Sequence, residues 1–388
     1  MGHTYDAIVI GGGSVGVPTA LFLTLEGLKV LVVESNPSVG QGGNKAAIGG
    51  VRATHSDPAK IFLCQESLRI FGEWQERYGH KIGWKKGGYC FPVYRTQEEN
   101  LLKTLLPIQQ SYGLKIDWLD AEDIREVIPG IMPEDLIGGT FSPDDGQVSP
   151  LLAIDAMYRV SRERGCTYRF RERVVDLIIK NGLVRGVRTE KGSYHSSLVI
   201  NAAGASAREV GRLAGLEVPV TPDSHEAGVS APMAQFLGPL VVDLRPGPEG
   251  RTSNFYFGQN HEGVIMFCYT PSEPVLGTNR EPTSEFLPVL ARRMVNLLPR
   301  LTRMLVRRVW RGLYPMTPDA LPICDRVREV EGLYLVVGMC GQGFMMGPGM
   351  GRNIANLIVH GTPLMPLEVF DALSFYRDFY GSSKEALK

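Results

Sequence analysis

The first forty residues alternate between apolar runs and glycine-rich breaks. Residues 5–10 form a short apolar run with β-branched side chains that ends at glycines, which predicts a buried strand. From Ser14 to Leu25 apolar residues recur with helical spacing, and Gly27 stands where a helix C-cap is expected. A second apolar run, 29–33, ends in Glu34. The order strand, glycine turn, helix, strand predicts a parallel βαβ unit.

As far as residue 224, segments in which hydrophobic residues recur with helical spacing alternate with segments of short apolar or alternating runs. Helical spacing predicts helices over 58–78, 96–112, 120–127 and 150–164. Short apolar or alternating runs predict strands over 87–94, 174–179, 183–189 and 196–200. We therefore expect mixed α/β structure through this part of the chain.

Short alternating runs dominate residues 225–310. The runs 229–232, 240–244, 253–258 and 264–269 predict an antiparallel sheet, and a helical stretch over 283–303 is expected to shield one of its faces. After it, 333–337 reads as a buried strand, followed by a glycine-rich turn and a helix through residue 358. The pattern thus returns to α/β structure at the end.

Composition narrows the class of protein. The 388 residues are 44% hydrophobic and 21% charged, which is ordinary for a globular chain of two domains. Lys plus Arg equals Asp plus Glu at 41 each, so no bulk charge favours nucleic acid or an anionic membrane. The six cysteines show no metal-ligand spacing and are expected to be free thiols in a reducing compartment. The cysteine spacing therefore predicts no metal site. No apolar run is long enough to span a membrane, so the sequence predicts a cytoplasmic protein.

The glycine turn carries a dinucleotide motif. Gly11, Gly13 and Gly16 fit GxGxxG between a predicted strand and helix. In this motif the glycines permit the tight turn, the approach of a pyrophosphate and close helix packing, and the helix N-terminus favours the phosphate charge. Glu34 lies about twenty residues on, where a carboxylate accepts ribose hydroxyls and disfavours a 2′-phosphate. FAD or NAD is therefore preferred to NADP.

Five further segments complete a set of motifs in order along the chain. They are 46–52 (AAIGGVR), 146–150 (GQVSP), 201–204 (NAAG), 310–322 (WRGLYPMTPDALP) and 341–348 (GQGFMMGP). With the glycine turn, these segments resemble the D-amino-acid oxidase superfamily of flavoproteins, in the branch of sarcosine oxidase, glycine oxidase and L-proline dehydrogenase. The set is specific for the superfamily and much less specific for the substrate.

The resemblance implies an α/β fold with FAD at a domain interface. A Rossmann-like FAD-binding domain (1–86, 145–224 and 325–388) would be interleaved with an α+β substrate-binding domain (87–144 and 225–324) built on a largely antiparallel sheet. The residues expected to bind FAD are Gly11, Gly13, Ser14, Val15, Gly16, Glu34, Ser35, Ala46, Ala47, Gly49, Gly50, Val174, Val175, Ala203, Gly204, Gly312, Gly341, Gly343, Phe344, Met345 and Met346.

The resemblance also implies a reaction. A hydride would pass from the α-carbon of a small amine or amino acid, such as sarcosine, dimethylglycine or a proline-like substrate, to flavin N5, and the imine would hydrolyse. Backbone N–H groups from Gly343 to Met346, opening a helix expected to begin near Gly349, would stabilise the reduced flavin.

Two departures from the family concern the flavin. Monomeric sarcosine oxidases attach it through a cysteine at the position of Gly312, so non-covalent FAD is expected here. The same enzymes place an oxygen-activating lysine where the sequence aligns Ile265, which favours a dehydrogenase with another electron acceptor over an oxidase.

A third departure concerns the substrate. The family's carboxylate-binding lysine corresponds to Met345, so a carboxylate substrate needs another cation. Arg52 and Arg311 are the candidates, because a guanidinium can fork onto a carboxylate, and a structural role is the alternative for both. Tyr256 and Tyr269 are candidates to line the substrate site through their hydroxyls, with a core position as the alternative.

Other functions stay open at this point. Oxidation of a 2-hydroxy acid or glycerol 3-phosphate occurs elsewhere in the superfamily, although a phosphate would demand a cluster of cations. A non-catalytic flavoprotein subunit within a larger complex is the alternative from a different class. The expected partner is a small-molecule substrate, and a second subunit or an electron acceptor stays open as a further partner.

Overall fold

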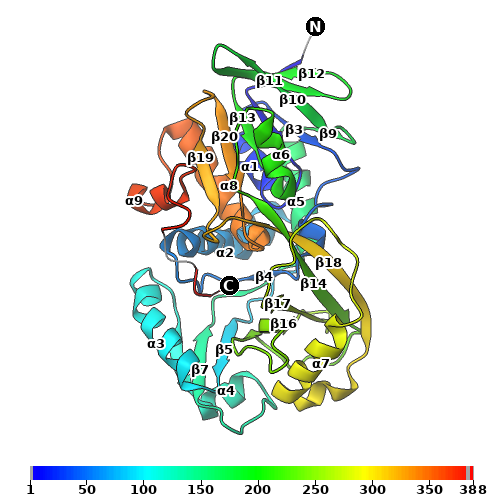
Figure 1. Cartoon of the computed structure of the whole chain (residues 1–388), viewed down its shortest axis with the longest axis vertical. Coiled ribbons are helices and arrows are strands. Elements are labelled where there is room, and N and C mark those ends of the chain that lie inside the picture. Colours follow the sequence, from blue (N-terminus) through cyan, green and yellow to red (C-terminus); the bar gives the residue numbers. More distant parts are fainter. Residues whose placement is uncertain (1–2, 382–384, 388) are drawn as a thin grey trace.

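The predicted βαβ unit lies in a six-stranded sheet in the upper half of the molecule (Figure 1). The computed structural model describes residues 3–381 and 385–387. The strand order is β19-β20-β13-β2-β3-β9, in which the β19–β20 pair is antiparallel and the other four pairs are parallel. Its strands are β2 (Ala7–Ile10), β3 (Val30–Glu34), β9 (Thr167–Phe170), β13 (Val199–Asn201), β19 (Ile323–Arg326) and β20 (Leu333–Val337).

Successive residues of β2 enter different cores, because side chains along a strand point alternately to its two faces. Ala7 and Val9 pack into a core built with helices, whereas Ile8 and Ile10 pack into a second core on the other face. That second core is shared with a small sheet of order β1-β12-β11-β10. The covering elements are α1 (Gly16–Leu25), α2 (Pro58–Tyr78), α5 (Pro150–Glu163) and α8 (Gly343–His360) on the first face, and β1 (His3–Thr4), β10 (Val174–Lys180), β11 (Leu183–Thr189) and β12 (Ser193–His195) on the second.

The helix α8 begins at Gly343, six residues before the expected start near Gly349. The glycines and Pro348 that suggested a loop lie inside the helix. A Cβ on Gly347 would lie 1.9 Å from the Ser14 carbonyl oxygen, and one on Gly351 would lie 2.6 Å from the Thr19 nitrogen. The glycines therefore allow α8 to pack closely against α1, which the sequence pattern alone does not reveal.

The lower half of the molecule is built on an eight-stranded sheet of order β18-β14-β17-β16-β15-β5-β7-β6 (Figure 1). The β15–β5 pair is parallel and the other six pairs are antiparallel, which confirms the expected largely antiparallel sheet. Its strands are β5 (Tyr89–Val93), β6 (Asp117–Asp120), β7 (Gly138–Ser142), β14 (Thr221–Ser230), β15 (Leu240–Asp243), β16 (Thr252–Gln259), β17 (Ile265–Pro271) and β18 (Val306–Met316).

One face of this sheet is shielded as predicted. Phe255, Phe257 and Phe267 pack with Phe286 and Leu290 of α7 in a single core. The expected helix over 283–303 divides into α7 (Phe286–Leu297) and a 3-10 helix, η3 (Pro299–Arg303), because a proline begins the second piece.

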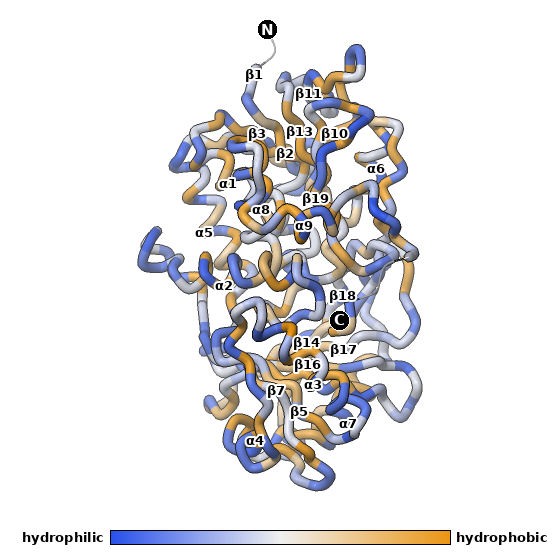
Figure 2. The backbone as a smooth tube through the Cα atoms, turned by 90° about the vertical axis from the view of Figure 1, so that its left-hand side faces the viewer, coloured by the Kyte–Doolittle hydropathy of each residue, from blue (hydrophilic) through white to orange (hydrophobic). Residues whose placement is uncertain are grey.

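Several of the remaining elements pack on one or the other of the two large sheets, such as α6 in the core behind the six-stranded sheet and α3 and α4 in the cores of the eight-stranded sheet. In Figure 2 the apolar parts of the chain gather around the strands, and hydrophilic parts lie at the outer turns. Among the described residues, no helix is both long and apolar enough to span a membrane. The helices and strands not yet given are α3 (Thr96–Ser111), α4 (Ala121–Val127), α6 (Ala207–Arg212), α9 (Leu367–Phe370), β4 (Gly50–Val51), β8 (Gly146–Gln147), η1 (Asn44–Ala46), η2 (Gly204–Ser206) and η4 (Asp371–Leu373).

Candidate functional site

A cavity of about 400 Å³ runs from the six-stranded sheet to the eight-stranded sheet. One end lies at the carboxyl ends of β2, β3, β13 and β20, where ligands bind in open parallel sheets. The other end is lined by residues of β14, β16, β17 and β18, and the first turn of α8 reaches the wall between them. Such an elongated cavity fits an extended ligand with chemically different ends.

The glycine turn has the form that a pyrophosphate requires. Gly11 adopts φ +108°, and a Cβ there would lie 2.6 Å from the Ala202 carbonyl oxygen. A Cβ on Gly16 would lie 1.9 Å from the Gly11 carbonyl oxygen. By contrast, a Cβ on Gly13 would meet nothing within 4 Å, because this glycine faces the open cavity. Two glycines thus close the turn and the third leaves room for a ligand, as the motif predicts.

Glu34 lies at the end of β3 beside this turn. Its carboxylate accepts hydrogen bonds from the Gly12 N–H (2.7 Å), the Asn36 N–H (2.7 Å) and the Asn36 side-chain amide (2.6 Å). The side chain is buried and lines the cavity. Each carboxylate oxygen has two lone pairs, so the group can still accept from ribose hydroxyls.

Small residues shape the middle of the cavity. A Cβ on Gly312 would lie 2.6 Å from the Ala46 Cβ, and a Cβ on Gly341 would lie 2.3 Å from the Tyr314 ring. The indole N–H of Trp310 donates to the Ala46 carbonyl oxygen at 2.9 Å, which ties β18 to the segment before β4. These close approaches leave space for a flat ring, and Gly312 offers no side-chain atom to which a cofactor could be attached.

Three ring-bearing side chains, those of His225, Tyr256 and Tyr314, line the end of the cavity at the eight-stranded sheet. The hydroxyls of Tyr256 and Tyr314 are 3.0 Å apart, and the His225 ring stacks on Tyr314 with centroids 3.9 Å apart. Burial raises the pKa of both phenols, so both stay neutral. The His225 Nε2 lies 3.1 Å from an Asp223 carboxylate oxygen, and its Nδ1 is buried with no hydrogen-bond partner among the described residues.

Asp223 orients this histidine. Burial by itself would raise the pKa of Asp223, but the hydrogen bond and charge of His225 outweigh burial and hold that pKa below its usual value. The carboxylate therefore stays ionised and favours the tautomer with a proton on Nε2. In that tautomer Nδ1 is an acceptor.

Most of the residues predicted to bind a cofactor line the cavity. Gly16 supports the turn from behind the lining, Val175 is exposed and Met346 is buried in the helical core. Val175 points away because it follows Val174 on a strand, whose side chains alternate. The predicted residues that line the cavity are Gly11, Gly13, Ser14, Val15, Glu34, Ser35, Ala46, Ala47, Gly49, Gly50, Val174, Ala203, Gly204, Tyr256, Gly312, Gly341, Gly343, Phe344 and Met345.

Three of the predicted substrate-binding residues lie outside the cavity lining. Tyr269 packs against Phe286 with ring centroids 5.1 Å apart. The Arg311 side chain is buried, with Nε 3.8 Å from the Glu226 carboxylate. The Arg52 guanidinium donates to the carbonyl oxygens of Thr54 and Leu387, and Arg52 is buried. The structure therefore places both arginines in structural contacts.

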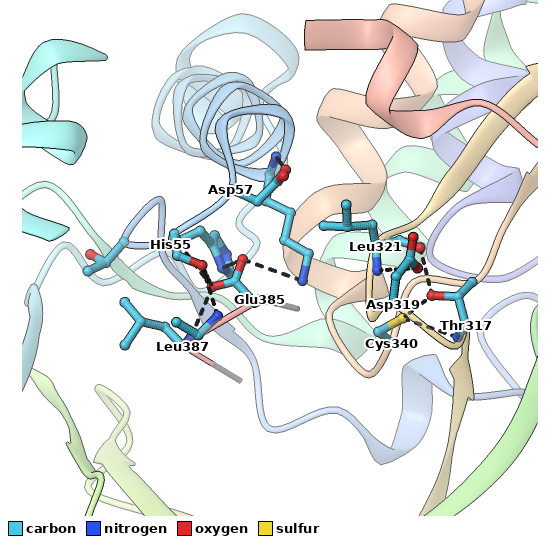
Figure 3. Close-up of polar contacts among 12 residues, drawn as sticks. His55, Asp57, Thr317, Asp319, Leu321, Cys340, Glu385 and Leu387 are labelled. Atoms are coloured by element: carbon cyan, nitrogen blue, oxygen red, sulfur yellow. Dashed lines mark hydrogen bonds and ion pairs between the residues drawn. The ribbon is translucent and has the colours of Figure 1, made fainter. Parts of the chain in front are cut away.

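The contact of Arg52 with Leu387 belongs to a buried cluster of charges. Figure 3 shows His55, Glu385 and Leu387 of this region side by side. Glu385 accepts hydrogen bonds from the Ser56 N–H (2.9 Å) and hydroxyl (2.8 Å), and lies 3.7 Å from the Lys60 ammonium and 3.9 Å from the His55 ring. The side chains of Glu385, Lys60 and His55 are fully buried.

Several lining residues were not singled out from the sequence. Arg280 lies in the connection between β17 and α7, and Tyr89 belongs to β5. A Cβ on Gly50 would lie 1.9 Å from the Tyr89 hydroxyl, so this contact explains a glycine of the family motif. No local pattern marks Arg280, since only the folding of its loop brings it to the cavity.

Comparison with known proteins places this geometry in context. The model of the family described as FAD dependent oxidoreductase (DAO) matches residues 6–357. Human mitochondrial dimethylglycine dehydrogenase is 23% identical over 94% of this chain and 44% of its own length, and mouse mitochondrial sarcosine dehydrogenase is 24% identical over 96% and 42%. The chain thus spans less than half the length of these relatives.

Solved structures of similar length also match. L-proline dehydrogenase from P. horikoshii superposes with a TM-score of 0.91 at 28% identity, over 99% of this chain and 100% of the other. Glycine oxidase from Bacillus cereus gives a TM-score of 0.81 at 26% identity, over 96% and 99%.

Proposed function

Since the chain belongs to the family of FAD-dependent oxidoreductases, we propose that it oxidises a small amine or amino acid at the carbon next to nitrogen. The observation that carries this proposal is that one continuous cavity reaches both the glycine turn with Glu34 and the paired hydroxyls of Tyr256 and Tyr314. Similarity to dehydrogenases and oxidases of dimethylglycine, sarcosine, glycine and proline supports the substrate class. Bound FAD supplies the acceptor for the hydride.

The chain's own residues have three tasks in this proposal. The glycine turn and Glu34 hold the cofactor without a covalent bond, since Gly312 replaces the attaching cysteine. The Tyr256 and Tyr314 hydroxyls enclose the substrate and exclude water. His225 accepts a proton from the substrate ammonium at Nδ1, because Asp223 holds the opposite nitrogen. A neutral amine is required before its α-hydrogen can leave as hydride.

We further propose a dehydrogenase rather than an oxidase. Ile265, the residue aligned with the oxygen-activating lysine, is fully buried in the core under α7 and does not line the cavity. Cys268 is the β17 residue that does, and no lysine lines the described part of the cavity. The choice of acceptor thus rests on the absence of a lysine from the described part of the cavity lining.

An anaerobic titration of the FAD-loaded protein tests the reaction class. Sarcosine, dimethylglycine, L-proline and glycine are added in turn, with glycerol 3-phosphate and lactate as representatives of the alternative chemistry. We expect one amine to bleach the flavin absorbance and the reduced flavin to recover slowly in air. Bleaching by lactate or glycerol 3-phosphate alone would replace the proposal, and a bound flavin that none of them reduces would favour a non-catalytic subunit.

Replacement of Glu34 by alanine tests the cofactor end. The variant loses the acceptor for the ribose and the anchor of the Gly12 N–H, so we expect FAD affinity to fall about 10- to 100-fold. Fluorescence titration of the apoprotein with FAD measures this change. Glu190→Ala is the matched control, because Glu190 is exposed and lies outside the cavity lining. Equal FAD affinity in both variants would remove Glu34 from the cofactor site.

A further inference from the structure

The loop between β20 and α8 has an unusual backbone. Gly338 adopts φ +72° and Gly341 adopts φ +81°, and between them Cys340 adopts φ +50°. A residue with a side chain is strained in this left-handed region, so it persists there only where the surrounding contacts fix its conformation. Gly338 and Gly341 line the cavity, whereas Cys340 is buried outside the lining. The shape of this part of the cavity wall thus depends on contacts behind the loop.

Thr317 supplies these contacts from the turn that follows β18. Its Oγ1 lies 3.2 Å from the Cys340 Sγ, and its N–H donates to the same sulfur at 3.5 Å. A Cβ on Gly338 would lie 2.5 Å from the Thr317 methyl carbon, so this methyl group packs directly on the backbone of the loop. Thr317 is buried and lies outside the cavity lining. Its hydroxyl and methyl groups therefore act on the cavity wall through the loop.

The turn that carries Thr317 is itself held in place. The Thr317 hydroxyl donates to the Leu321 carbonyl oxygen at 2.7 Å, and the Leu321 N–H donates to the Asp319 carboxylate at 3.1 Å. The same carboxylate accepts from the Arg377 Nε at 2.6 Å and from its Nη2 at 3.1 Å, a two-point contact that fixes both groups. Figure 3 shows Thr317, Asp319, Leu321 and Cys340 together in one network. Thr317 thus presents a fixed surface to the loop.

The loop leads directly into the first turn of α8, whose N–H groups have no acceptor within the helix. Residues 343–345 of that turn line the cavity, and N–H groups at a helix N-terminus favour negative charge. From these contacts we infer that Thr317 is a positioning residue, which holds the loop so that the N–H groups face the flavin ring. The inference rests on the proposed function and adds to it a residue behind the cavity wall.

A redox titration of the bound flavin against a reference dye tests this role. The shift of the midpoint potential from that of free FAD gives the ratio of the affinities for reduced and oxidised FAD. Thr317→Val removes the hydroxyl and keeps the N–H. We expect it to lower this ratio about tenfold, the scale of one charge-assisted hydrogen bond, which is about 30 mV for a two-electron couple. Thr317→Ser keeps the hydroxyl and should lie closer to the wild type.

Thr24→Val is the matched control. Thr24 is buried in α1, its hydroxyl donates to the Ala20 carbonyl oxygen at 2.7 Å, and it lies outside the cavity lining. This variant loses an equivalent hydrogen bond, so any general loss of stability should appear in both variants. A change of potential confined to Thr317→Val supports the inference, and an equal change in Thr24→Val overturns it.

Cys340→Ala removes the same contact from the side of the loop, and it carries the test if Thr317→Val does not fold. The two changes should not add, because they remove one shared interaction. An unchanged potential in either single variant, or fully additive changes in the double variant, overturns the inference. The titration needs no amine, so a failure of amine oxidation contradicts the proposed function and leaves this result independent. A wild-type protein that binds no FAD would overturn both.

Discussion

Gly16→Ala is expected to abolish FAD loading and to lower stability by about 3 kcal/mol, the upper range for an overpacked core. The new Cβ would lie 1.9 Å from the Gly11 carbonyl oxygen, so the turn must open and the start of α1 must move away from β2. The pyrophosphate site is formed by that same turn. The flavin absorbance of the purified protein and its thermal unfolding with and without added FAD measure the two effects.

Gly72→Ala provides the control for this variant. Gly72 lies within α2, and a Cβ there would meet nothing within 4 Å. Alanine in a helix interior is favoured over glycine by about 1 kcal/mol, so this variant should retain FAD and unfold at or above the wild-type temperature. A Gly16→Ala protein with full flavin content and unchanged stability would show that the turn does not bind the cofactor as proposed.

Glu385→Gln is expected to destabilise the protein by about 3–5 kcal/mol, the cost of leaving a buried charge uncompensated. Lys60 is fully buried, 3.7 Å from the Glu385 carboxylate. Burial and the positive charges of Arg52 and Lys60 hold the pKa of His55 well below its usual value, so His55 is neutral and Glu385 is the acid that offsets Lys60. Urea unfolding of the variant measures the loss.

The change in the free energy of unfolding at acid pH should also depend on the Glu385 carboxylate. Burial alone would raise the pKa of Glu385, but Lys60, Arg52 and the Ser56 hydrogen bonds lower it below its usual value. A carboxylate with a depressed pKa contributes stability above the pKa of the unfolded chain, about 4.3, and loses that contribution as the pH falls through the folded value. The wild-type protein should therefore lose this part of its stability in acid, and Glu385→Gln should not.

Two further variants separate charge from packing. Glu368→Gln removes an exposed carboxylate and should unfold like the wild type. The double variant Lys60→Met with Glu385→Leu removes both charges, and it should recover much of the loss because apolar pairs often replace buried ion pairs without cost. If Glu385→Gln alone unfolds like the wild type, the docking of residues 385–387 does not stabilise the protein.

The dinucleotide unit could be predicted from sequence because its signals are local. The glycine turn and Glu34 lie within a single βαβ unit, so periodicity and spacing locate them together. The start of α8 was wrong because glycine and proline usually indicate a loop, and only the packing against α1 explains their place in a helix. Sequence patterns within a single unit thus predicted the glycine turn and Glu34 better than they predicted the packing of α8 against α1.

The substrate end depends on contacts between distant segments. Arg52 and Arg311 were reasonable candidates by residue type, but Leu387 and Glu226 engage them, and no periodicity reveals such pairing. Arg280 reaches the cavity through hydrogen bonds that link its loop to β14. The division into an FAD-binding domain (1–86, 145–224 and 325–388) and a substrate-binding domain (87–144 and 225–324) stays our proposal, and it is consistent with most strands of the two large sheets.

The wide separation in sequence of the cavity-lining residues has a consequence for the order of folding. The lining runs from Ile10 to Met345, and the Arg52–Leu387 contact joins residues 335 positions apart. During synthesis, the first strand and the glycine turn therefore leave the ribosome long before the segments that close the cavity around them. Long-range closure of this kind is slow, because the chain must lose its loop entropy before these contacts form. We therefore expect FAD to be retained only by a chain that has been synthesised at least as far as α8, so that cofactor loading follows translation of nearly the whole sequence.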